Sequence, residues 1–385
     1  MATSKQSIQP PLAVYVHWPY CARICPYCDF NVYKTRADTT LIEAILQDLS
    51  YWQRLTPQHH ITSIHFGGGT PSLMKAGDVA QIIHKVRALW TVANNIEIAL
   101  EANPSDADKN HWIALSKAGV NRLSLGVQSF DADVLKKLGR DHDDVMAHKA
   151  AKLAKDIFPS VSLDLIFGHK DQSAQDWEID LNHALSYAPN HISTYQLTIE
   201  EGTAFAKAEA RGDSKAVDSD ISADRYEQVR LRLTQAGYDH YEVSNFAKMG
   251  NTSKHNLSYW KGHDYVGVGP GAHGRYTKNG VRYAAIAAMQ PKAYTASVKN
   301  NGTGVDHTEA LSKTAQGEEY VMMGLRISEG LSLSRFENIT GNTLPEGIIE
   351  HLVQMELLNQ DGDIIRATQS GRNVLNTVCQ KLLGA

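Results

Sequence analysis

The sequence predicts an α/β fold, a partial barrel of six β/α units followed by a small, mostly helical C-terminal domain. Apolar strand-like segments alternate with amphipathic helical segments through the first half of the chain, which is typical of a parallel sheet covered by helices. Six such units are compatible with an incomplete barrel or with an open doubly wound sheet. Unusual polar residues at the ends of successive strands favour the barrel.

The alternating segments follow one another without interruption. The predicted strands are 12–18, 61–66, 96–100, 122–126, 161–167 and 191–197. The predicted helices are 39–52, a helix through 82–89, 106–118, 131–138, 142–156 and 173–187. The first helix places Leu41, Ile45 and Leu49 on one face, as an amphipathic helix requires. Gly119 is a good helix C-terminus because glycine readily adopts the left-handed conformation found there.

Residues with ligand-binding side chains or an open backbone gather at the carboxyl ends of the predicted strands. They are three clustered cysteines, the glycines 67–69, Glu101, Gln128 and Asp164. In parallel α/β folds this edge of the sheet is where ligands bind. We therefore expect one site shared by five strands.

The pattern changes beyond residue 200, and we expect three regions in all. The barrel covers 12–245, an extension covers 246–312, and a C-terminal module covers 313–385. Within the extension, 276–312 is polar and loosely patterned, which indicates a connecting region.

The C-terminal module is predicted to contain short helices and a small hairpin at 358–367, an outline that resembles a winged helix. Its charge is mixed rather than basic, which argues against DNA binding. A lid or a packing module is the favoured interpretation.

Composition excludes several classes of protein. The 385 residues are 42% hydrophobic and 21% charged, as in ordinary soluble globular proteins, and no apolar run reaches the roughly 18–20 residues of a membrane span. The net charge of −4 argues against a broad nucleic-acid-binding surface. Residues 1–11 are polar and lack the apolar core of a signal peptide. We therefore expect a cytoplasmic protein in a reducing compartment.

Three of the four cysteines fall within eight residues, at Cys21, Cys25 and Cys28. Thiolates this close together can converge on one soft metal centre. The spacing suits a 4Fe–4S cluster with one iron left free for a small molecule. A catalytic zinc site assisted by His17 or Asp29 is the alternative. A disulfide is disfavoured in a reducing compartment, and Cys379 is interpreted as an ordinary thiol.

The motif Cys-x3-Cys-x2-Cys, followed by Gly-Gly-Gly-Thr-Pro at 67–71, resembles the radical S-adenosylmethionine (SAM) superfamily. Within it, the chain is most similar to the oxygen-independent coproporphyrinogen III oxidase family, and there to its heme chaperone branch. The resemblance extends from about residue 12 to the C-terminus. It implies a radical SAM barrel in which Cys21, Cys25 and Cys28 bind three irons of a 4Fe–4S cluster and the fourth iron chelates SAM.

The resemblance also implies which residues bind SAM. The glycine-rich loop, with Gly68, Gly69 and Thr70, would receive the methionine amine, because glycines expose backbone carbonyls as acceptors. Glu101 would accept hydrogen bonds from the ribose, and Arg140 would pair with the methionine carboxylate. The other SAM contacts implied by the resemblance are Tyr15, Gln128 and Asp164.

Two departures from the family pattern bear on function. The decarboxylating oxidases carry a further cysteine two residues after the third, where this chain has Phe30. That substitution argues against oxidase activity. The loop after the fifth strand usually reads Gly-Leu-Pro-x-Gln, whereas this chain has His169 and Lys170 in place of Leu-Pro.

The segment 255–260, His-Asn-Leu-Ser-Tyr-Trp, is typical of the heme chaperone branch. His255 is the candidate heme ligand, since histidine ligates heme iron, and Tyr259 and Trp260 offer flat apolar contact to a porphyrin. The alternative is a buried aromatic turn whose histidine satisfies a backbone group. His273, in the glycine-rich loop 266–274, is a second candidate.

The sequence therefore predicts a heme chaperone that binds heme, a 4Fe–4S cluster and SAM, and that transfers heme to an acceptor such as a respiratory protein. Enzymatic turnover is left open. The alternatives are an oxygen-independent coproporphyrinogen III oxidase and a tRNA-modifying radical SAM enzyme. A homodimer and a peripheral membrane association through the acceptor are compatible with this interpretation, and no nucleic-acid partner is expected.

Overall fold

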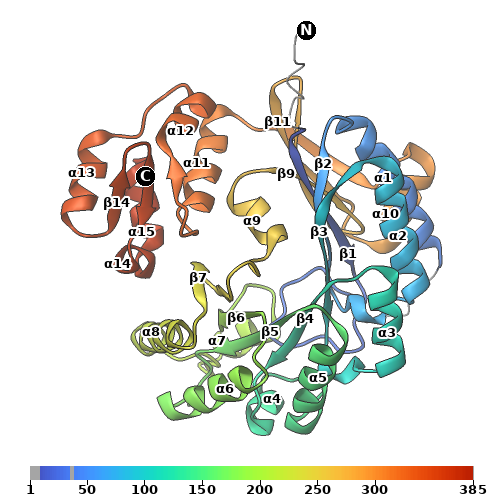
Figure 1. Ribbon diagram of the computed structural model, residues 1–385, viewed down its shortest axis with the longest axis horizontal. Coiled ribbons are helices and arrows are strands. Elements are labelled where there is room, and N and C mark those ends of the chain that lie inside the picture. Colours follow the sequence, from blue (N-terminus) through green and yellow to red (C-terminus); the bar gives the residue numbers. More distant parts are fainter. Residues whose placement is uncertain (1–8, 35–38, 385) are drawn as a thin grey trace.

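The computed structural model describes residues 9–34 and 39–384. Within them, twelve strands form one open sheet in the order β12-β11-β10-β9-β1-β2-β3-β4-β5-β6-β8-β7. Helices cover the outer face of the curved sheet, while α9 (Lys254–Trp260) lies on its inner side, near the C-terminal module (Figure 1). The predicted fold class, an α/β partial barrel, is confirmed.

The centre of the sheet consists of the six predicted parallel strands. They are β1 (Pro11–Trp18), β2 (His60–Gly68), β3 (Thr91–Ala102), β4 (Arg122–Gln128), β5 (Ser160–Phe167) and β6 (His191–Gln196). The helices and 3-10 turns between them are α1 (Thr39–Leu55), η1 (Pro71–Leu73), α2 (Ala76–Leu89), η2 (Pro104–Asp106), α3 (Lys109–Ala118), α4 (Ala132–Lys137), α5 (Asp144–Ile157) and α6 (Ala174–Ser186). All six strands were predicted from the sequence.

Burial and capping explain why these segments form. Leu12, Ala13 and Val14 of β1 are all fully buried, and since successive side chains point to opposite faces, this strand is covered on both faces. Helix α3 ends at Gly119, which is left-handed with φ 115°, as the sequence predicts. Helix α6 begins with a capping box in which Ser173 and Asp176 bond each other's backbone amides.

On the β1 side, the sheet continues beyond the six units. The added elements are β9 (Asp264–Val268), which is parallel to β1, the antiparallel strands β10 (His273–Lys278), β11 (Val281–Ala287) and β12 (Val305–Ala310), and helix α10 (Pro291–Asn301). The segment 276–312 is therefore largely sheet and helix rather than a connector. Its strands lie at an edge, and β12 is exposed along nearly all its length, so no apolar alternation marks it in the sequence.

The other edge of the sheet is built from short elements. They are α7 (Ala204–Glu209), α8 (Ser219–Gln235), β7 (Asp239–Glu242) and β8 (Asn245–Ala247). Strand β8 pairs antiparallel with both β6 and β7. The chain thus forms one short strand, β7, and turns back directly into a second, β8.

The C-terminal module packs around an apolar core separate from that of the barrel. Its elements are α11 (Lys313–Gly324), β13 (Leu331–Ser332), α12 (Leu333–Thr340), α13 (Glu346–Gln354), β14 (Leu358–Asp361), β15 (Ile364–Ala367), α14 (Gln369–Asn373) and α15 (Leu375–Leu383). The predicted hairpin is β14–β15, and Cys379 is buried within this core. Among the described residues, none of the helices combines the length and apolar character needed to cross a membrane.

Polar contacts join the module to the barrel. The carboxylate of Glu319 on α11 pairs with Arg275 on β10 at 2.8 Å, and Glu329 pairs with Lys261 at 2.7 Å. We call the boundary between the barrel core and the module core, which these contacts cross, the seam.

Candidate functional site

A pocket of 400 Å³ lies at the carboxyl ends of strands β1 to β6. We call it the cysteine pocket. It is lined by the three clustered cysteines and by nearly all the residues that the sequence predicts to contact SAM, namely Cys21, Cys25, Cys28, Gly68, Gly69, Thr70, Glu101, Gln128, Arg140 and Asp164. The strand-end alignment seen in the sequence thus brings these residues together in one cavity.

Packing between the first two strand-end loops explains the need for glycine at position 69. The amide of Gly69 donates to the carbonyl of Trp18 at 2.7 Å, and the amide of Thr70 donates to the carbonyl of Tyr20 at 2.9 Å. A Cβ on Gly69 would lie 2.7 Å from the Tyr20 carbonyl oxygen, closer than a side chain can approach. Glycine therefore allows this loop to lie directly beside the start of the cysteine segment.

Arg140 links the cysteine segment to the ends of β3 and β4. Its Nη1 donates to Cys25 Sγ at 3.2 Å, while Nη2 donates to Asn103 Oδ1 at 2.6 Å and to the carbonyl of Gly126 at 3.1 Å. The guanidinium therefore places a positive charge beside the sulfur of Cys25. Arg140 thus contacts one of the predicted cluster ligands.

Glu101 lies between the glycine loop and β2. Its Oε2 accepts a hydrogen bond from the amide of Gly68 at 3.2 Å, and its Oε1 lies 2.9 Å from Nε2 of His65. The carboxylate is about one-third exposed. It therefore has capacity to accept further hydrogen bonds from a hydroxyl-bearing ligand.

Asp164 on β5 is held by two serines. Its carboxylate accepts hydrogen bonds from Ser124 Oγ at 2.7 Å and from Ser162 Oγ at 2.9 Å. Burial raises the pKa of Asp164, although these hydrogen bonds act in the opposite direction. Gln128, at the end of β4, has a positive φ of 67°, a strained conformation of the kind often found at functional sites.

The donor set fits an iron–sulfur cluster. Three thiols line one pocket, and none is in a disulfide. Within residues 9–34 and 39–384, no three His, Cys, Asp or Glu side chains are arranged to hold a single metal ion; the thiolates of a 4Fe–4S cluster are spread around a larger body. Burial raises the pKa of Cys28 to about 11, so cluster assembly must displace thiol protons.

The zinc alternative requires His17 or Asp29 as the assisting ligand; Asp29 lines the cysteine pocket, whereas His17 is placed elsewhere. His17, which would assist a zinc ion, lies 3.1 Å from the hydroxyl of Tyr15 through Nδ1 and 2.9 Å from the carbonyl of Asn31 through Nε2. Both of its ring nitrogens are therefore engaged. His17 also lines a different pocket.

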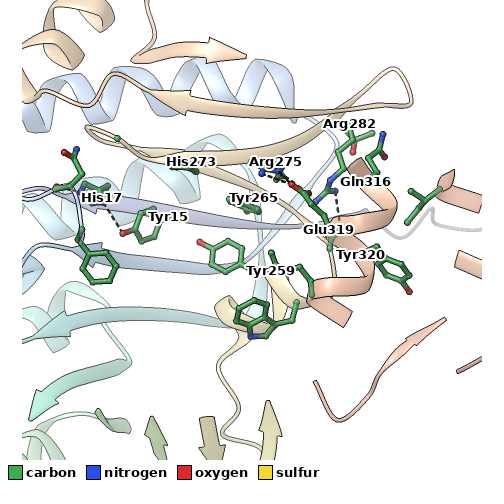
Figure 2. Close-up of a pocket in the computed structure, with 18 of the residues that line it drawn as sticks. Tyr15, His17, Tyr259, Tyr265, His273, Arg275, Arg282, Gln316, Glu319 and Tyr320 are labelled. Atoms are coloured by element: carbon green, nitrogen blue, oxygen red, sulfur yellow. Dashed lines mark hydrogen bonds and ion pairs between the residues drawn. The ribbon is translucent and has the colours of Figure 1, made fainter. Parts of the chain in front are cut away.

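That second pocket is larger, with a volume of 680 Å³. It lies between strands β1, β9, β10 and β11, helix α9, and helices α11 and α12 of the C-terminal module. Figure 2 shows the rings of Tyr15, Tyr259 and Tyr265 close together within it. We call it the aromatic pocket, and its other labelled residues are His17, His273, Arg275, Arg282, Gln316, Glu319 and Tyr320.

Tyr15, expected to contact SAM, lines the aromatic pocket and not the cysteine pocket. Successive residues of a strand alternate between its faces, so Tyr15 and His17 share a face of β1. There the Tyr15 ring also stacks against His65, with ring centroids 6.1 Å apart.

His255, the first candidate heme ligand, lines neither pocket. It is 1% exposed, its Nδ1 lies 3.0 Å from Ser63 Oγ, and its Nε2 lies 2.7 Å from the hydroxyl of Tyr259. The ring also stacks on His65, with centroids 4.7 Å apart. Both ring nitrogens of His255 are therefore engaged, and one of them contacts Tyr259, which does line the aromatic pocket.

Phe30 and its neighbour Asp29 line both pockets. Phe30 is 59% exposed, although burial would be favourable for a side chain of this size. Position 30, where the oxidases carry a further cysteine, is thus the boundary between the cysteine pocket and the aromatic pocket.

The unusual pair His169 and Lys170 lies away from both pockets. His169 forms an isolated β-bridge with Ala216, and the amide of Lys170 donates to the carbonyl of Lys215 at 2.8 Å. Pairing with residues 215 and 216 holds the loop that contains His169 and Lys170 in place. The departure from the family pattern therefore affects loop packing and not pocket lining.

Comparison with known proteins agrees with the motifs. A family model described as the radical SAM superfamily matches residues 15–184, and one described as the HemN C-terminal domain matches 311–374. The protein named heme chaperone HemW of Escherichia coli is 34% identical over 97% of this chain and 98% of the relative. The chain belongs to the radical SAM superfamily.

Other relatives extend this picture. The mitochondrial radical S-adenosyl methionine domain-containing protein 1 of Mus musculus is 35% identical over 99% of this chain and 89% of the relative. The crystal structure of coproporphyrinogen III oxidase (HemN) from Escherichia coli matches with a TM-score of 0.80 at 22% identity, over 97% of this chain and 90% of that one. At this identity the match to HemN shows the shared fold.

Several pocket residues escaped the sequence analysis. Asn103, two residues after Glu101, bonds both Arg140 and Thr70, and its place just past a strand end was the available signal. His65 lies on β2 and faces Glu101. In the aromatic pocket, the sequence does not reveal Tyr265, Arg275 and Arg282. They lie on β9, β10 and β11, and no sequence motif relates these strands to the C-terminal module that faces them.

Proposed function

We propose that this protein is a heme chaperone, which binds heme and transfers it to an acceptor protein. The full-length similarity to proteins named heme chaperone HemW, at 34% identity over 97% of this chain, carries the proposal. Phe30 supports it, because the boundary between the pockets holds a phenyl ring where the decarboxylating oxidases carry a thiol. The chain offers a large aromatic pocket suited to a flat apolar cargo.

In this proposal the cysteine pocket holds a 4Fe–4S cluster on Cys21, Cys25 and Cys28, with SAM beside it. When bound, the cluster and SAM supply one-electron chemistry. The chain's own residues position them: Arg140 holds a positive charge at Cys25 Sγ, and Glu101 presents a part-exposed carboxylate. Asp164 adds a second carboxylate, oriented by its two serine donors.

The acceptor and the compartment complete the proposal. We propose a cytoplasmic protein that reaches a respiratory acceptor by docking to it and associates with the membrane only through that acceptor. A homodimer is compatible with this role.

One experiment tests the proposed function. The cluster is reconstituted anaerobically in the full chain, heme is titrated in, and the Soret band is followed by difference spectroscopy. The heme-loaded protein is then mixed with a heme-free acceptor protein. Formation of a stable complex followed by transfer supports the chaperone, and absence of any heme complex overturns it.

A second candidate function is the coproporphyrinogen III oxidase reaction. It is favoured by one observation, that the aromatic pocket adjoins the cysteine pocket through Asp29 and Phe30, which would place a porphyrinogen near bound SAM. The same reconstituted protein is given coproporphyrinogen, SAM and a reductant. Formation of protoporphyrinogen would establish the oxidase, and its absence together with heme transfer leaves the chaperone.

A further inference from the structure

His273 is distinguished from the other histidine of the aromatic pocket by its free ring. Two histidines line this pocket, His17 and His273. Both ring nitrogens of His17 are engaged with Tyr15 and Asn31. The ring of His273 is exposed and makes no hydrogen bond to another residue in the described part of the chain. A free imidazole in a cavity lined by aromatic and polar side chains is a ready ligand for a soft or borderline metal.

We infer that heme binds in the aromatic pocket with His273 as the protein ligand of its iron. The inference rests on the proposed function and names the site of the cargo. His273 thus takes the role of iron ligand that the sequence suggests for His255, because the ring of His255 is buried and bonded at both nitrogens. His255 becomes a positioning residue that acts through Tyr259.

The backbone that carries His273 is held firmly. A Cβ on Gly267 would lie 2.2 Å from the carbonyl oxygen of His273, so the glycine permits β9 and the start of β10 to approach closely. The amide of Gly269 donates to the hydroxyl of Tyr294 at 3.0 Å, and that hydroxyl donates to Asp48 at 2.8 Å. This buried chain of hydrogen bonds fixes the loop that precedes the histidine, as a preorganised ligand site requires.

The size and lining of the pocket suit a porphyrin. Its 680 Å³ lies within the roughly 300–1,000 Å³ of small-molecule sites. The rings of Tyr259 and Tyr265 meet edge to face with centroids 4.5 Å apart, and Tyr15, Trp260 and Tyr320 add aromatic surface. Such rings provide flat apolar contact with hydroxyls left to find polar partners.

One end of the pocket is suited to the two propionates of heme. Three arginines line the cavity, Arg275, Arg282 and Arg335, against two carboxylates, Asp29 and Glu319. Figure 2 shows Arg275 and Arg282 on the β10–β11 side, beside Glu319 of the C-terminal module. Arginine binds carboxylates in a bidentate manner. A propionate would therefore compete with Glu319 for Arg275 and loosen a contact between the module and the barrel.

A single histidine ligand suits a carrier. Transfer then consists of one exchange, in which the bond between iron and His273 breaks as a bond between iron and a ligand of the acceptor forms. No electron or proton donor is needed if the acceptor's ligand is neutral. Heme could leave along the seam between the barrel and the C-terminal module, so that its release would not require either apolar core to unfold.

Hemin titration into the full chain with its reconstituted cluster tests the inference, with the iron ligand read by resonance Raman and electron paramagnetic resonance. His273→Ala should weaken hemin binding by roughly tenfold or more, since even indirect supports of a metal site contribute 10–100-fold. It should also abolish the histidine–iron signature, and added imidazole should restore that signature. His273→Met, which keeps a side chain of similar size, should replace it with a thioether signature, and this variant serves if the alanine variant does not fold.

Two further variants are matched controls. His84→Ala removes an exposed histidine on α2 that lines neither pocket, and it should leave affinity and signature unchanged. His255→Ala should weaken binding while retaining the histidine–iron signature. Retention of that signature in His273→Ala, with its loss in His255→Ala, would overturn the inference and leave the chaperone function intact. Failure of the unmodified protein to bind hemin at all would reject both.

Discussion

The cysteine pocket and the aromatic pocket share Asp29 and Phe30 but are built in different ways. The cysteine pocket is assembled from the ends of consecutive parallel strands, each bringing a short polar segment to the same edge. The aromatic pocket is assembled from strands β1 and β9 to β11, helix α9 and a separately packed module, whose segments lie far apart in the chain. One is a rigid strand-end site, and the other is a seam between two cores.

This difference matches two different tasks. A cluster with SAM must be held in fixed geometry, and a parallel sheet edge provides rigid anchors. In the proposed function a cargo must be released, and a contact between the module and the barrel such as the ion pair of Arg275 and Glu319 breaks at modest cost, since part-exposed ion pairs contribute only about 0.2–1 kcal/mol. The following experiments test this difference between the two pockets and the parts of the fold that support them.

The largest expected effect is loss of the cluster in Cys25→Ser. Iron content should fall from roughly four ions per chain to near zero, because a thiolate ligand of the cluster is removed. Hemin binding in the aromatic pocket should persist. Cys379→Ser is the control, since this thiol lies in the core of the C-terminal module, and it should leave iron content unchanged. Joint loss of iron and hemin binding in Cys25→Ser would show that the pockets are not independent.

Tyr294→Phe should lower the free energy of unfolding by disturbing the loop that precedes His273 at the aromatic pocket. The change removes the hydroxyl that bonds the buried Gly269 amide and Asp48, and each unsatisfied buried group costs about 1–3 kcal/mol. Chemical denaturation measures the loss, and hemin affinity should fall while iron content is retained. Tyr283→Phe, which removes a half-buried hydroxyl with no hydrogen-bond partner among the described residues, should change stability by less than about 0.5 kcal/mol.

Stability should depend on pH through Asp48, which supports the same loop. Burial raises the pKa of Asp48 from 3.8 to about 6, although Tyr294 and Thr303 donate hydrogen bonds to it. Between these values the folded chain keeps a proton that the unfolded chain has released, so this group's contribution to stability falls as pH rises through the window. The loss approaches about 3 kcal/mol, at 1.36 kcal/mol for each unit of pKa.

Urea denaturation at several pH values between 4 and 7 measures this slope. Asp48→Asn should flatten it, whereas Asp224→Asn, at an exposed position on α8, should retain it. Equal slopes in the unmodified protein and Asp48→Asn would contradict the assignment to Asp48.

The smallest expected change in stability is at the seam between the barrel and the C-terminal module. Glu319→Gln should change stability by no more than about 1 kcal/mol, because the ion pair with Arg275 is part-exposed. Hemin affinity should rise, since Arg275 becomes free to pair with a propionate. Glu227→Gln, which breaks the ion pair with Arg230 on α8, should have a similar cost and no effect on hemin. A fall in hemin affinity in Glu319→Gln would show that Glu319 supports the pocket instead.

The sequence by itself determined the six central strands, the helices between them and the grouping of cysteines, glycine loop and strand-end carboxylates. These features depend on local periodicity and on the rule that parallel strands share their carboxyl edge, so short segments carry the information. The same locality explains why the sequence alone places Gly69 and Glu101 in one pocket.

Only the tertiary structure decided the rest. Strand β12 is recognised by its pairing and not by its exposed residues, and Tyr15 faces the aromatic pocket because of how β1 is paired on both sides. Tyr259 and Trp260 of the hexapeptide 255–260 line the aromatic pocket. Its His255 is buried and engaged at both ring nitrogens, and the free imidazole of the pocket is that of His273. Motifs report which residue types are present; burial and hydrogen bonding, which depend on distant segments, decide which of them can bind.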